Sequence, residues 1–144
     1  MTVESQQNGI EYFAKKFVQE FNISNRYFLA DVAESEEIMS SIYLEPVWCF
    51  PLEKLLITGS DIGRIKKYIS FAGDMYKSGD NQVKGVVQWV MLEYFVGFDI
   101  KKRSRFYKHL SHELYDATKD VERYLKNIHD KLYPELNYQL LSAK

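Results

Sequence analysis

The sequence predicts an all-α protein, a single-domain bundle of about six helices that occupies residues 1–144. Apolar side chains recur at spacings of three and four along most of the chain, which is the period of an α-helix. No segment alternates apolar and polar residues over a useful length, as a half-buried strand does. Gly and Pro residues stand between the helical patterns, where helices stop. We expect one domain, because 144 residues is a common single-domain size.

The N-terminal part predicts two helices. The first apolar stripe begins at Ile10 and ends at Phe21. Asn8 and Glu11 resemble a capping box at its start, with Asn in place of the usual Ser or Thr. A second helical pattern covers residues 24–33.

A third helix is predicted from Ser35, because the two Glu residues after it favour the positive end of a helix dipole. Pro46 is expected to end this helix. The next residues, VWCF at 47–50, are compatible with a short extended segment or with a helix, and the sequence leaves both open. Pro51 is well placed as the first residue of a short helix, which Gly59 should stop.

Residues 60–97 predict a central antiparallel helical hairpin. Ser60 and Asp61 open its first arm. Gly79 is expected to end that arm in the left-handed conformation, and Asp80 to cap the second arm. The apolar stripes of the two arms consist of Ile62, Ile65, Ile69, Ala72 and Tyr76, and of Val83, Val86, Val87, Val90 and Tyr94.

The longest apolar stripe runs from Phe106 to Leu132 and predicts a long C-terminal helix that Pro134 ends. Its apolar residues step by fours and threes, with charged residues between them. A free-standing coiled coil would show the same pattern, but a helix packed on a bundle is the more common explanation for a protein of this size.

The net charge of −1 conceals an asymmetry along the chain. Residues 1–50 carry 3 basic and 8 acidic side chains, whereas residues 51–144 carry 16 and 12, so the two parts have charges of −5 and +4. Regions of opposite potential can steer a charged partner.

The acidic residues of the N-terminal part form a candidate partner-binding set: Asp31, Glu34, Glu36, Glu37 and Glu45. One interpretation is a charge mimic that occupies the basic cleft of a nuclease. The structural alternative is that Glu36 and Glu37 only favour a helix start.

The segment KKRSRFYK, residues 101–108, carries five basic side chains, two aromatic ones and no acid. It is the strongest nucleic-acid candidate of the chain, through Lys101, Lys102, Arg103 and Arg105. The slightly acidic net charge argues against nucleic acid. The alternative is a solvated basic turn before the long helix, with Ser104 as a cap.

Metal and catalytic motifs give little support for an enzyme. His109, His112 and Glu113 lie close in sequence, but the His spacing and the Glu position do not match the zinc-protease signature. The pattern of a di-iron bundle is also absent. Cys49 is the only cysteine, so no internal disulfide forms, and we expect it to be a small buried hydrophobic residue. We therefore expect no catalytic residue, no metal and no cofactor.

The apolar runs are shorter than the roughly 20 residues that a membrane span needs, and the N-terminus lacks the pattern of a signal peptide. We therefore expect a cytoplasmic protein with no membrane partner.

Residues 65–95, IKKYISFAGDMYKSGDNQVKGVVQWVMLEYF, resemble a pattern in a family of small helical bacterial proteins. In that pattern an apolar helix with an aromatic, an acid, a Met and a Ser leads into an Asp-started helix that closes on Leu-Glu-Tyr. The matching residues are Phe71, Asp74, Met75, Ser78, Asp80, Val83, Val87, Leu92, Glu93 and Tyr94. Some of these proteins resemble immunity partners of polymorphic or contact-dependent growth-inhibition toxins. The resemblance implies a non-enzymatic immunity protein that binds a cognate toxin and blocks its active site. The alternative function is a small nucleic-acid-associated or regulatory protein.

Overall fold

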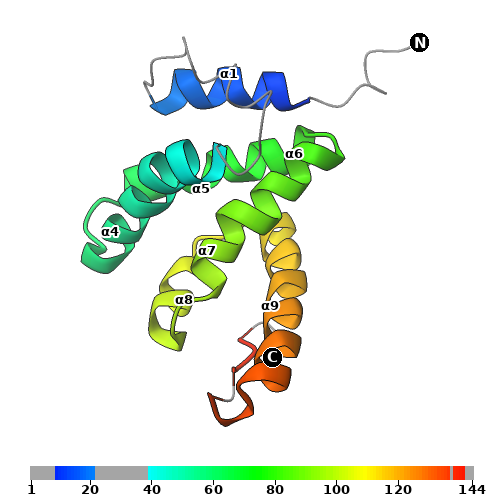
Figure 1. Cartoon of the computed structure of the whole chain (residues 1–144). Helices are drawn as coiled ribbons and strands as arrows, with labels where there is room; N and C mark the ends of the chain where they lie inside the picture. Colours follow the sequence, from blue (N-terminus) through cyan, green and yellow to red (C-terminus); the bar gives the residue numbers. More distant parts are fainter. Residues whose placement is uncertain (1–8, 22–38, 137, 142–144) are drawn as a thin grey trace.

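The computed structural model describes residues 9–21, 39–136 and 138–141. Within these residues the chain is helical and contains no strand, which confirms the predicted all-α class (Figure 1). The elements are α1 (Ile10–Phe21), η2 (Met39–Cys49), α4 (Phe50–Thr58), α5 (Ile62–Ser78), α6 (Asn81–Val86), η3 (Val87–Leu92), α7 (Glu93–Val96), α8 (Ile100–Tyr107), α9 (His112–Leu132) and η4 (Pro134–Leu136). The proposed cap at Asn8, the helix over residues 24–33 and the helix start at Ser35 lie outside the described residues.

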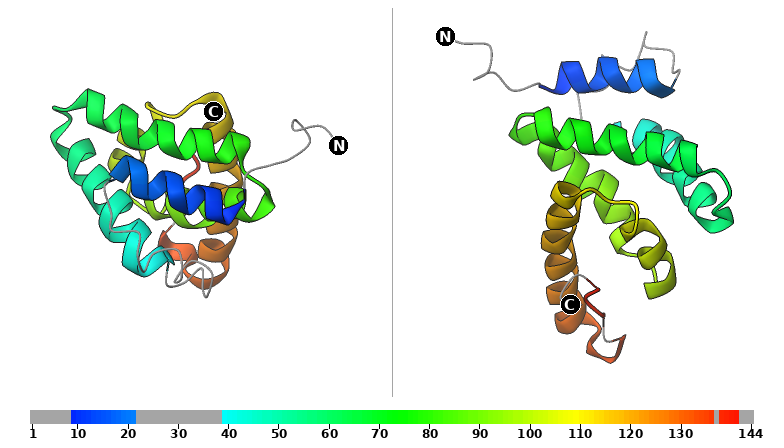
Figure 2. Two further views of the ribbon diagram at one scale, coloured as in Figure 1. Left: turned by 90° about the horizontal axis from the view of Figure 1, so that it is seen from above. Right: turned by 180° about the vertical axis from the view of Figure 1, so that it is seen from behind.

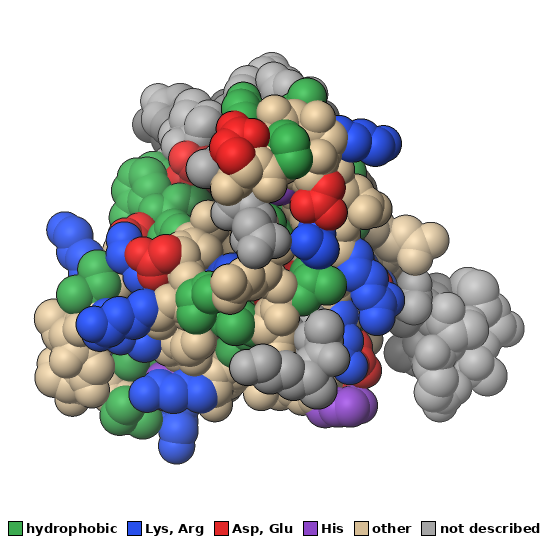
Figure 3. Space-filling view, turned by 90° about the horizontal axis from the view of Figure 1, so that it is seen from below, with side chains coloured by type: hydrophobic (Ala, Val, Ile, Leu, Met, Phe, Trp, Pro, Cys, Tyr) green, Lys and Arg blue, Asp and Glu red, His purple; other side chains and the backbone are tan. Residues whose placement is uncertain are grey.

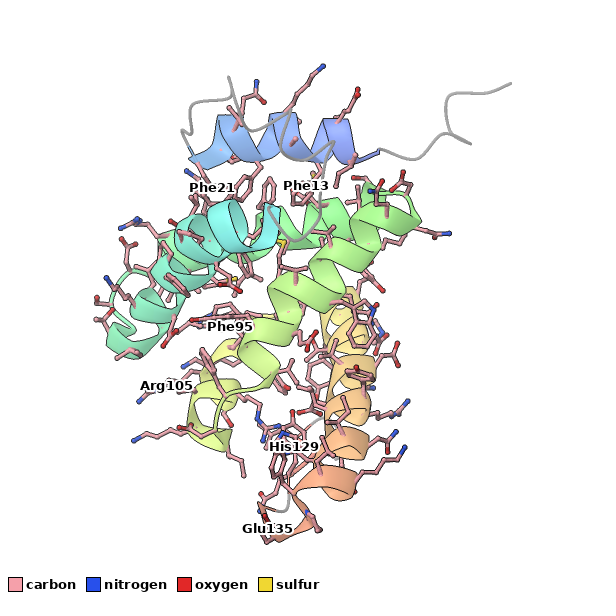
Figure 4. The ribbon with its side chains drawn as sticks, viewed as in Figure 1. Phe13, Phe21, Phe95, Arg105, His129 and Glu135 are labelled. Carbon is pink, nitrogen blue, oxygen red and sulfur yellow. The ribbon has the colours of Figure 1, made fainter. Side chains whose placement is uncertain are left out.

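Helix α1 lies across one end of the bundle, over α5 and α6 (Figures 1 and 2). Its stripe of phenylalanines faces α5, and Figure 4 shows Phe13 and Phe21 pointing from α1 toward the bundle. The ring centroid of Phe71 lies 5.6 Å from that of Phe13 and 5.2 Å from that of Phe21. Burial of these aromatic rings therefore attaches α1 to the rest of the protein.

The helical segment around Pro46 continues through the proline, so the predicted helix end at this residue was wrong. Residues 39–49 adopt the wider π-helical geometry and lead directly into α4, which makes residues 47–50 helical as well. In an α-helix the proline ring clashes with the carbonyl group four residues earlier, and the wider π-helical geometry avoids this clash. One buried stripe with a spacing of four holds the two segments against the core: Leu44, Trp48, Leu52 and Leu56. The Trp48 indole N–H also donates a hydrogen bond of 2.9 Å to the Tyr68 carbonyl.

The central hairpin forms with the predicted caps. The Asp61 side chain accepts a hydrogen bond from the Arg64 amide at 3.2 Å, and the Asp80 side chain accepts one from the Val83 amide at 2.9 Å. Gly59 ends α4 with a φ of 65°, as its position predicts. The first arm is α5, and α6, η3 and α7 form the second, which diverges from α5 after the turn (Figure 1).

Gly79 is not left-handed, which corrects the prediction for this turn. Its φ of −78° and ψ of 159° describe extended backbone that any residue adopts. Glycine is needed for a different reason, because a Cβ atom here would stand 2.4 Å from Val83 Cγ1 and 2.6 Å from the Met75 carbonyl oxygen. The turn therefore requires glycine because Val83 and the Met75 carbonyl leave no room for a side chain, and not because the backbone is left-handed.

The long C-terminal stripe is divided between two helices. A break at residues 108–111 separates α8 from α9, and Ser111, rather than Ser104, caps α9 by accepting a hydrogen bond from the Leu114 amide. The break lets α8 turn its own face into the core, where the Phe106 ring stacks on Phe95 with centroids 4.4 Å apart. Helix α9 packs against α5, η3 and α7 and ends before Pro134, as predicted.

One continuous core connects all the larger helices. Its fully buried side chains include Phe13, Trp48, Phe95, Phe106 and Met91. Cys49 is buried among them, as expected, and burial raises the pKa of its thiol, with the negative charges of Glu45 and Glu53 adding to the effect. A thiol with a raised pKa is a poor nucleophile. Among the described residues, no helix combines the length and apolar character that crossing a membrane requires.

Candidate partner-binding surface

Glu45 is the one member of the acidic set that the structure places. Asp31, Glu34, Glu36 and Glu37 lie outside the described residues. Glu45 lies in η2 and is half-buried. It lines an open hollow of about 290 Å³ together with Trp89, Val90, Glu93 and Tyr94 of the second hairpin arm.

The second hairpin arm has two faces, and this explains why Trp89 and Glu93 point toward the hollow. Its inner face carries the buried residues Val86, Val87, Met91, Leu92, Phe95 and Val96. Residues four apart share one side of a helix, so Trp89 and Glu93 occupy the opposite side, next to η2. Trp89 is 40% exposed. The Trp89 ring also contacts Tyr124 of α9 edge to face, with centroids 5.2 Å apart, and Tyr124 is 49% exposed.

We call these five residues the acidic–aromatic surface: Glu45, Trp89, Glu93, Tyr94 and Tyr124. They come from η2, from the second hairpin arm and from α9. Trp and Tyr are enriched at protein interfaces because their large rings bury much area at little entropic cost. The tertiary structure therefore gathers two acids and three aromatic rings on one part of the exterior.

The two carboxylates of this surface have no hydrogen bond or ion pair with any residue that the structure describes. Partial burial raises the pKa of the Glu93 carboxyl, because it removes water from the charged form. The Tyr94 hydroxyl donates a hydrogen bond of 2.6 Å to Glu53 Oε1. The polar end of Tyr94 is therefore occupied, and its ring is what it contributes to the hollow.

The basic segment does not form one basic face. Arg103 is buried, with 2% of its surface exposed, and its guanidinium bonds to Glu122 and to the carbonyls of Phe98 and Gln139. Lys102 Nζ lies 3.9 Å from Glu53 Oε2. Arg105 of α8 (Figure 4) is half-buried and lines a small hollow with Leu56 of α4, and Lys101 is exposed.

The candidate nucleic-acid residues are therefore split between the interior and the exterior. Viewed from below, the Lys and Arg side chains stand in separate groups among acidic and apolar ones (Figure 3). The inward direction of Arg103 corrects the expectation that all four basic residues share a phosphate-binding role. Helix geometry gives the reason, because Arg103 lies three residues before Phe106, on the side of α8 that faces the core.

Arg103 belongs to a buried network that ties the C-terminal segment to the bundle. Glu122 Oε2 accepts hydrogen bonds from Arg103 Nη1 at 3.0 Å, from the Tyr107 hydroxyl at 2.7 Å and from the Leu141 amide at 3.2 Å. The Arg103 guanidinium also lies 4.5 Å from the centroid of the Tyr138 ring. The network has a structural role, because each of its polar groups is occupied by another part of the chain.

The histidines form no metal centre among the described residues. No group of three or more His, Cys, Asp or Glu side chains there is arranged to hold a metal ion. His112 Nε2 lies 3.3 Å from Asp116 Oδ2 on the exposed side of α9. Burial lowers the pKa of His109, and the positive charges of Lys108 and Lys66 lower it further.

Another hollow, of about 680 Å³, is an open groove between α1 and α5. Its charged lining alternates in sign: Lys16, Glu20, Lys67, Asp74 and Lys77. Such a mixed lining favours no ligand of one charge, and, unlike the acidic–aromatic surface, the groove is not lined by a Trp.

Sequence reasoning named Glu45 but missed Trp89, Glu93 and Tyr124 as surface residues. One local signal points to Trp89, because it lies off the apolar stripe that runs through Val86, Val87 and Val90. A Trp outside the stripe of an amphipathic helix is expected to be exposed. Its contact with Tyr124, 35 residues further along the chain, has no comparable signal in the sequence.

The fold defines the protein as an all-α helical domain. The chain belongs to the family described as a domain of unknown function, DUF7674, which matches residues 50–126. The matched range includes Trp89, Glu93, Tyr94 and Tyr124, whereas Glu45 lies outside it. No curated protein and no solved structure matches the chain.

Proposed function

We propose that this protein is a non-enzymatic immunity protein, which binds a cognate bacterial toxin through the acidic–aromatic surface and thereby blocks the toxin's active site. The observation that carries the proposal is the exposed Trp89 ring, which lines one hollow with Glu45 and Glu93, two carboxylates without a partner among the described residues. Exposed Trp and Tyr residues are the usual anchors of protein interfaces.

The charge of this surface supports a basic partner. Acidic groups placed opposite a basic patch accelerate association and give specificity. A nuclease binds phosphates with basic residues, so its active-site cleft is a suitable target for carboxylates. The resemblance to immunity proteins rests on residues 65–95, and this segment contains Trp89, Glu93 and Tyr94.

A growth-rescue experiment tests the proposal. The C-terminal domain of the protein encoded directly upstream of this gene is expressed in a bacterial host, alone and together with this chain. We expect the domain to stop growth and the chain to restore it. Trp89→Ala should abolish rescue, because truncation of an interface anchor raises the dissociation constant by about 30-fold or more.

Tyr133→Ala provides the matched control, since Tyr133 is another exposed aromatic residue, located where α9 ends. This variant should rescue growth as well as the unchanged chain does. A harmless upstream domain, or full rescue by Trp89→Ala, would contradict the proposal. Binding of random RNA that weakens steeply between about 50 and 200 mM salt would instead support the nucleic-acid alternative.

A further inference from the structure

The hollow between η2 and the second hairpin arm combines two kinds of group that attract a cation. Glu45 and Glu93 supply carboxylates, and Trp89 and Tyr94 supply aromatic rings. Among the described residues, neither carboxylate has a basic partner. A volume of about 290 Å³ is at the lower limit of pockets for small-molecule ligands, so one side-chain head group suits it better than a cofactor.

The interior of the same protein shows what such a combination of groups binds. The Arg103 guanidinium stacks over the Tyr138 ring at 4.5 Å while it pairs with Glu122 at 3.0 Å. There, an arginine satisfies a ring and a carboxylate at the same time. The hollow presents the same two kinds of group on the exterior.

We infer that this hollow binds the guanidinium of an arginine side chain presented by the protein partner. The inference rests on the proposed function and names the chemistry of the contact. Arginine fits better than lysine, because its planar group stacks on aromatic rings and its five N–H donors can bond to two carboxylates. The guanidinium is also more weakly hydrated than an ammonium group, so it loses less hydration free energy when it enters a partly buried site.

A peptide titration tests the inference without the natural partner. The full ¹⁵N-labelled chain is titrated with acetyl-Gly-Arg-Gly-amide, and the indole N–H signal of Trp89 is followed by NMR. Matched peptides carry Lys or the uncharged arginine analogue citrulline in place of Arg. We expect saturable shifts with the Arg peptide, binding about fivefold weaker with Lys and no shift with citrulline at the same concentration.

Charge-removing variants locate the site. Glu45→Gln and Glu93→Gln should each weaken binding of the Arg peptide at least about fivefold. Both substitutions keep the shape of the side chain and remove a charge that has no partner among the described residues, so the fold should persist, as an unchanged circular dichroism spectrum would verify. Glu135→Gln is the control, because Glu135 is an exposed carboxylate of η4, beyond the end of α9 (Figure 4), and does not line the hollow.

Absence of Trp89 shifts with the Arg peptide, or equal shifts with citrulline, would overturn the inference. The growth-rescue experiment separates this failure from failure of the proposed function. If Trp89→Ala abolishes rescue and the Arg peptide does not bind, the immunity function stands and the arginine site falls. If the Arg peptide binds and the unchanged chain does not rescue growth, the site stands and the immunity function falls.

Discussion

The guanidinium of Arg103 in α8 lies 3.0 Å from the carboxylate of Glu122 in α9, and both side chains are almost fully buried. The same carboxylate oxygen also accepts bonds from Tyr107 and from the Leu141 amide. Three parts of the chain therefore meet at one charged group. Removal of one member of a buried pair leaves the other charge uncompensated, which destabilises more than loss of an exposed pair.

Glu122→Gln should lower the free energy of unfolding by about 3 kcal/mol, because it leaves the Arg103 charge buried without a counter-charge. Urea unfolding followed by circular dichroism measures the change. Asp120→Asn is the matched control, since it removes the exposed pair in which Arg123 and Asp120 lie 3.9 Å apart. The control should change the free energy by less than about 1 kcal/mol. Equal losses in the two variants would contradict a dominant role of the buried pair.

Tyr138→Phe should lower the free energy of unfolding by about 1 kcal/mol. The substitution removes the hydrogen bond of 2.8 Å from the Tyr138 hydroxyl to the Val96 carbonyl and leaves the ring beneath Arg103. Tyr133→Phe, at an exposed ring, should have no measurable effect. Thermal unfolding of the three proteins compares them directly, and an unchanged melting temperature in Tyr138→Phe would show that the hydroxyl bond adds nothing.

The stability of the protein should fall in alkaline solution. Burial raises the pKa of Tyr138 to about 12, and burial together with the hydrogen bond to Glu122 raises the pKa of Tyr107. A raised pKa means that the folded state holds the tyrosine proton more tightly than the unfolded state does. The stabilisation is therefore complete below the unfolded pKa of about 10 and is lost as the pH rises toward the folded values.

Urea unfolding between about pH 8 and pH 11 measures this dependence. Tyr107→Phe removes one of the buried groups that titrate in this range, so it should make the decline above about pH 10 less steep. A decline of the same steepness in this variant would mean that other groups cause the alkaline loss.

Gly79→Ala should destabilise the protein by about 1–3 kcal/mol, because the added methyl group would collide with Val83 and with the Met75 carbonyl. Gly85→Ala is the contrasting substitution. No atom lies within 4 Å of a Cβ built at Gly85, and this residue lies inside helix α6. Alanine there should raise the free energy of unfolding by up to about 1 kcal/mol. Chemical unfolding of both variants tests whether space, and not helix propensity, decides the outcome at the turn.

Glu93→Gln should raise the melting temperature slightly at neutral pH and also weaken partner binding. Burial raises the pKa of Glu93, because it disfavours the charged carboxylate in the folded state. At pH values above the unfolded pKa of this group, which include neutral pH, the charged carboxylate therefore opposes folding. A residue that serves partner binding rather than the fold is expected to show this combination, in which its substitution raises stability and weakens growth rescue. A lower melting temperature would indicate a structural role for the carboxylate.

The sequence predicted best where the signal was local. Asp61 and Asp80 cap helices with side chains that reach amides three residues away, so a few neighbouring residues decide the structure. Pro46 misled because residues 39–49 adopt π-helical geometry, which continues through the proline and leaves Leu44 and Trp48 buried on either side of it. Ser104 was predicted as the cap of the long helix, but Ser111 caps it, because residue 104 lies inside α8, where Phe106 packs on Phe95.

The sequence by itself determined the all-α class, the central hairpin and most of the buried stripes, because helix periodicity and capping depend on residues close together in the chain. Only the tertiary structure decided that Arg103 turns inward to Glu122, and that Trp89 lines one hollow with Glu45 and contacts Tyr124 on the exterior. These contacts join residues 19 or more positions apart. Whether a charged or aromatic side chain is buried or exposed depends on which helix packs against it, and no local pattern contains that information.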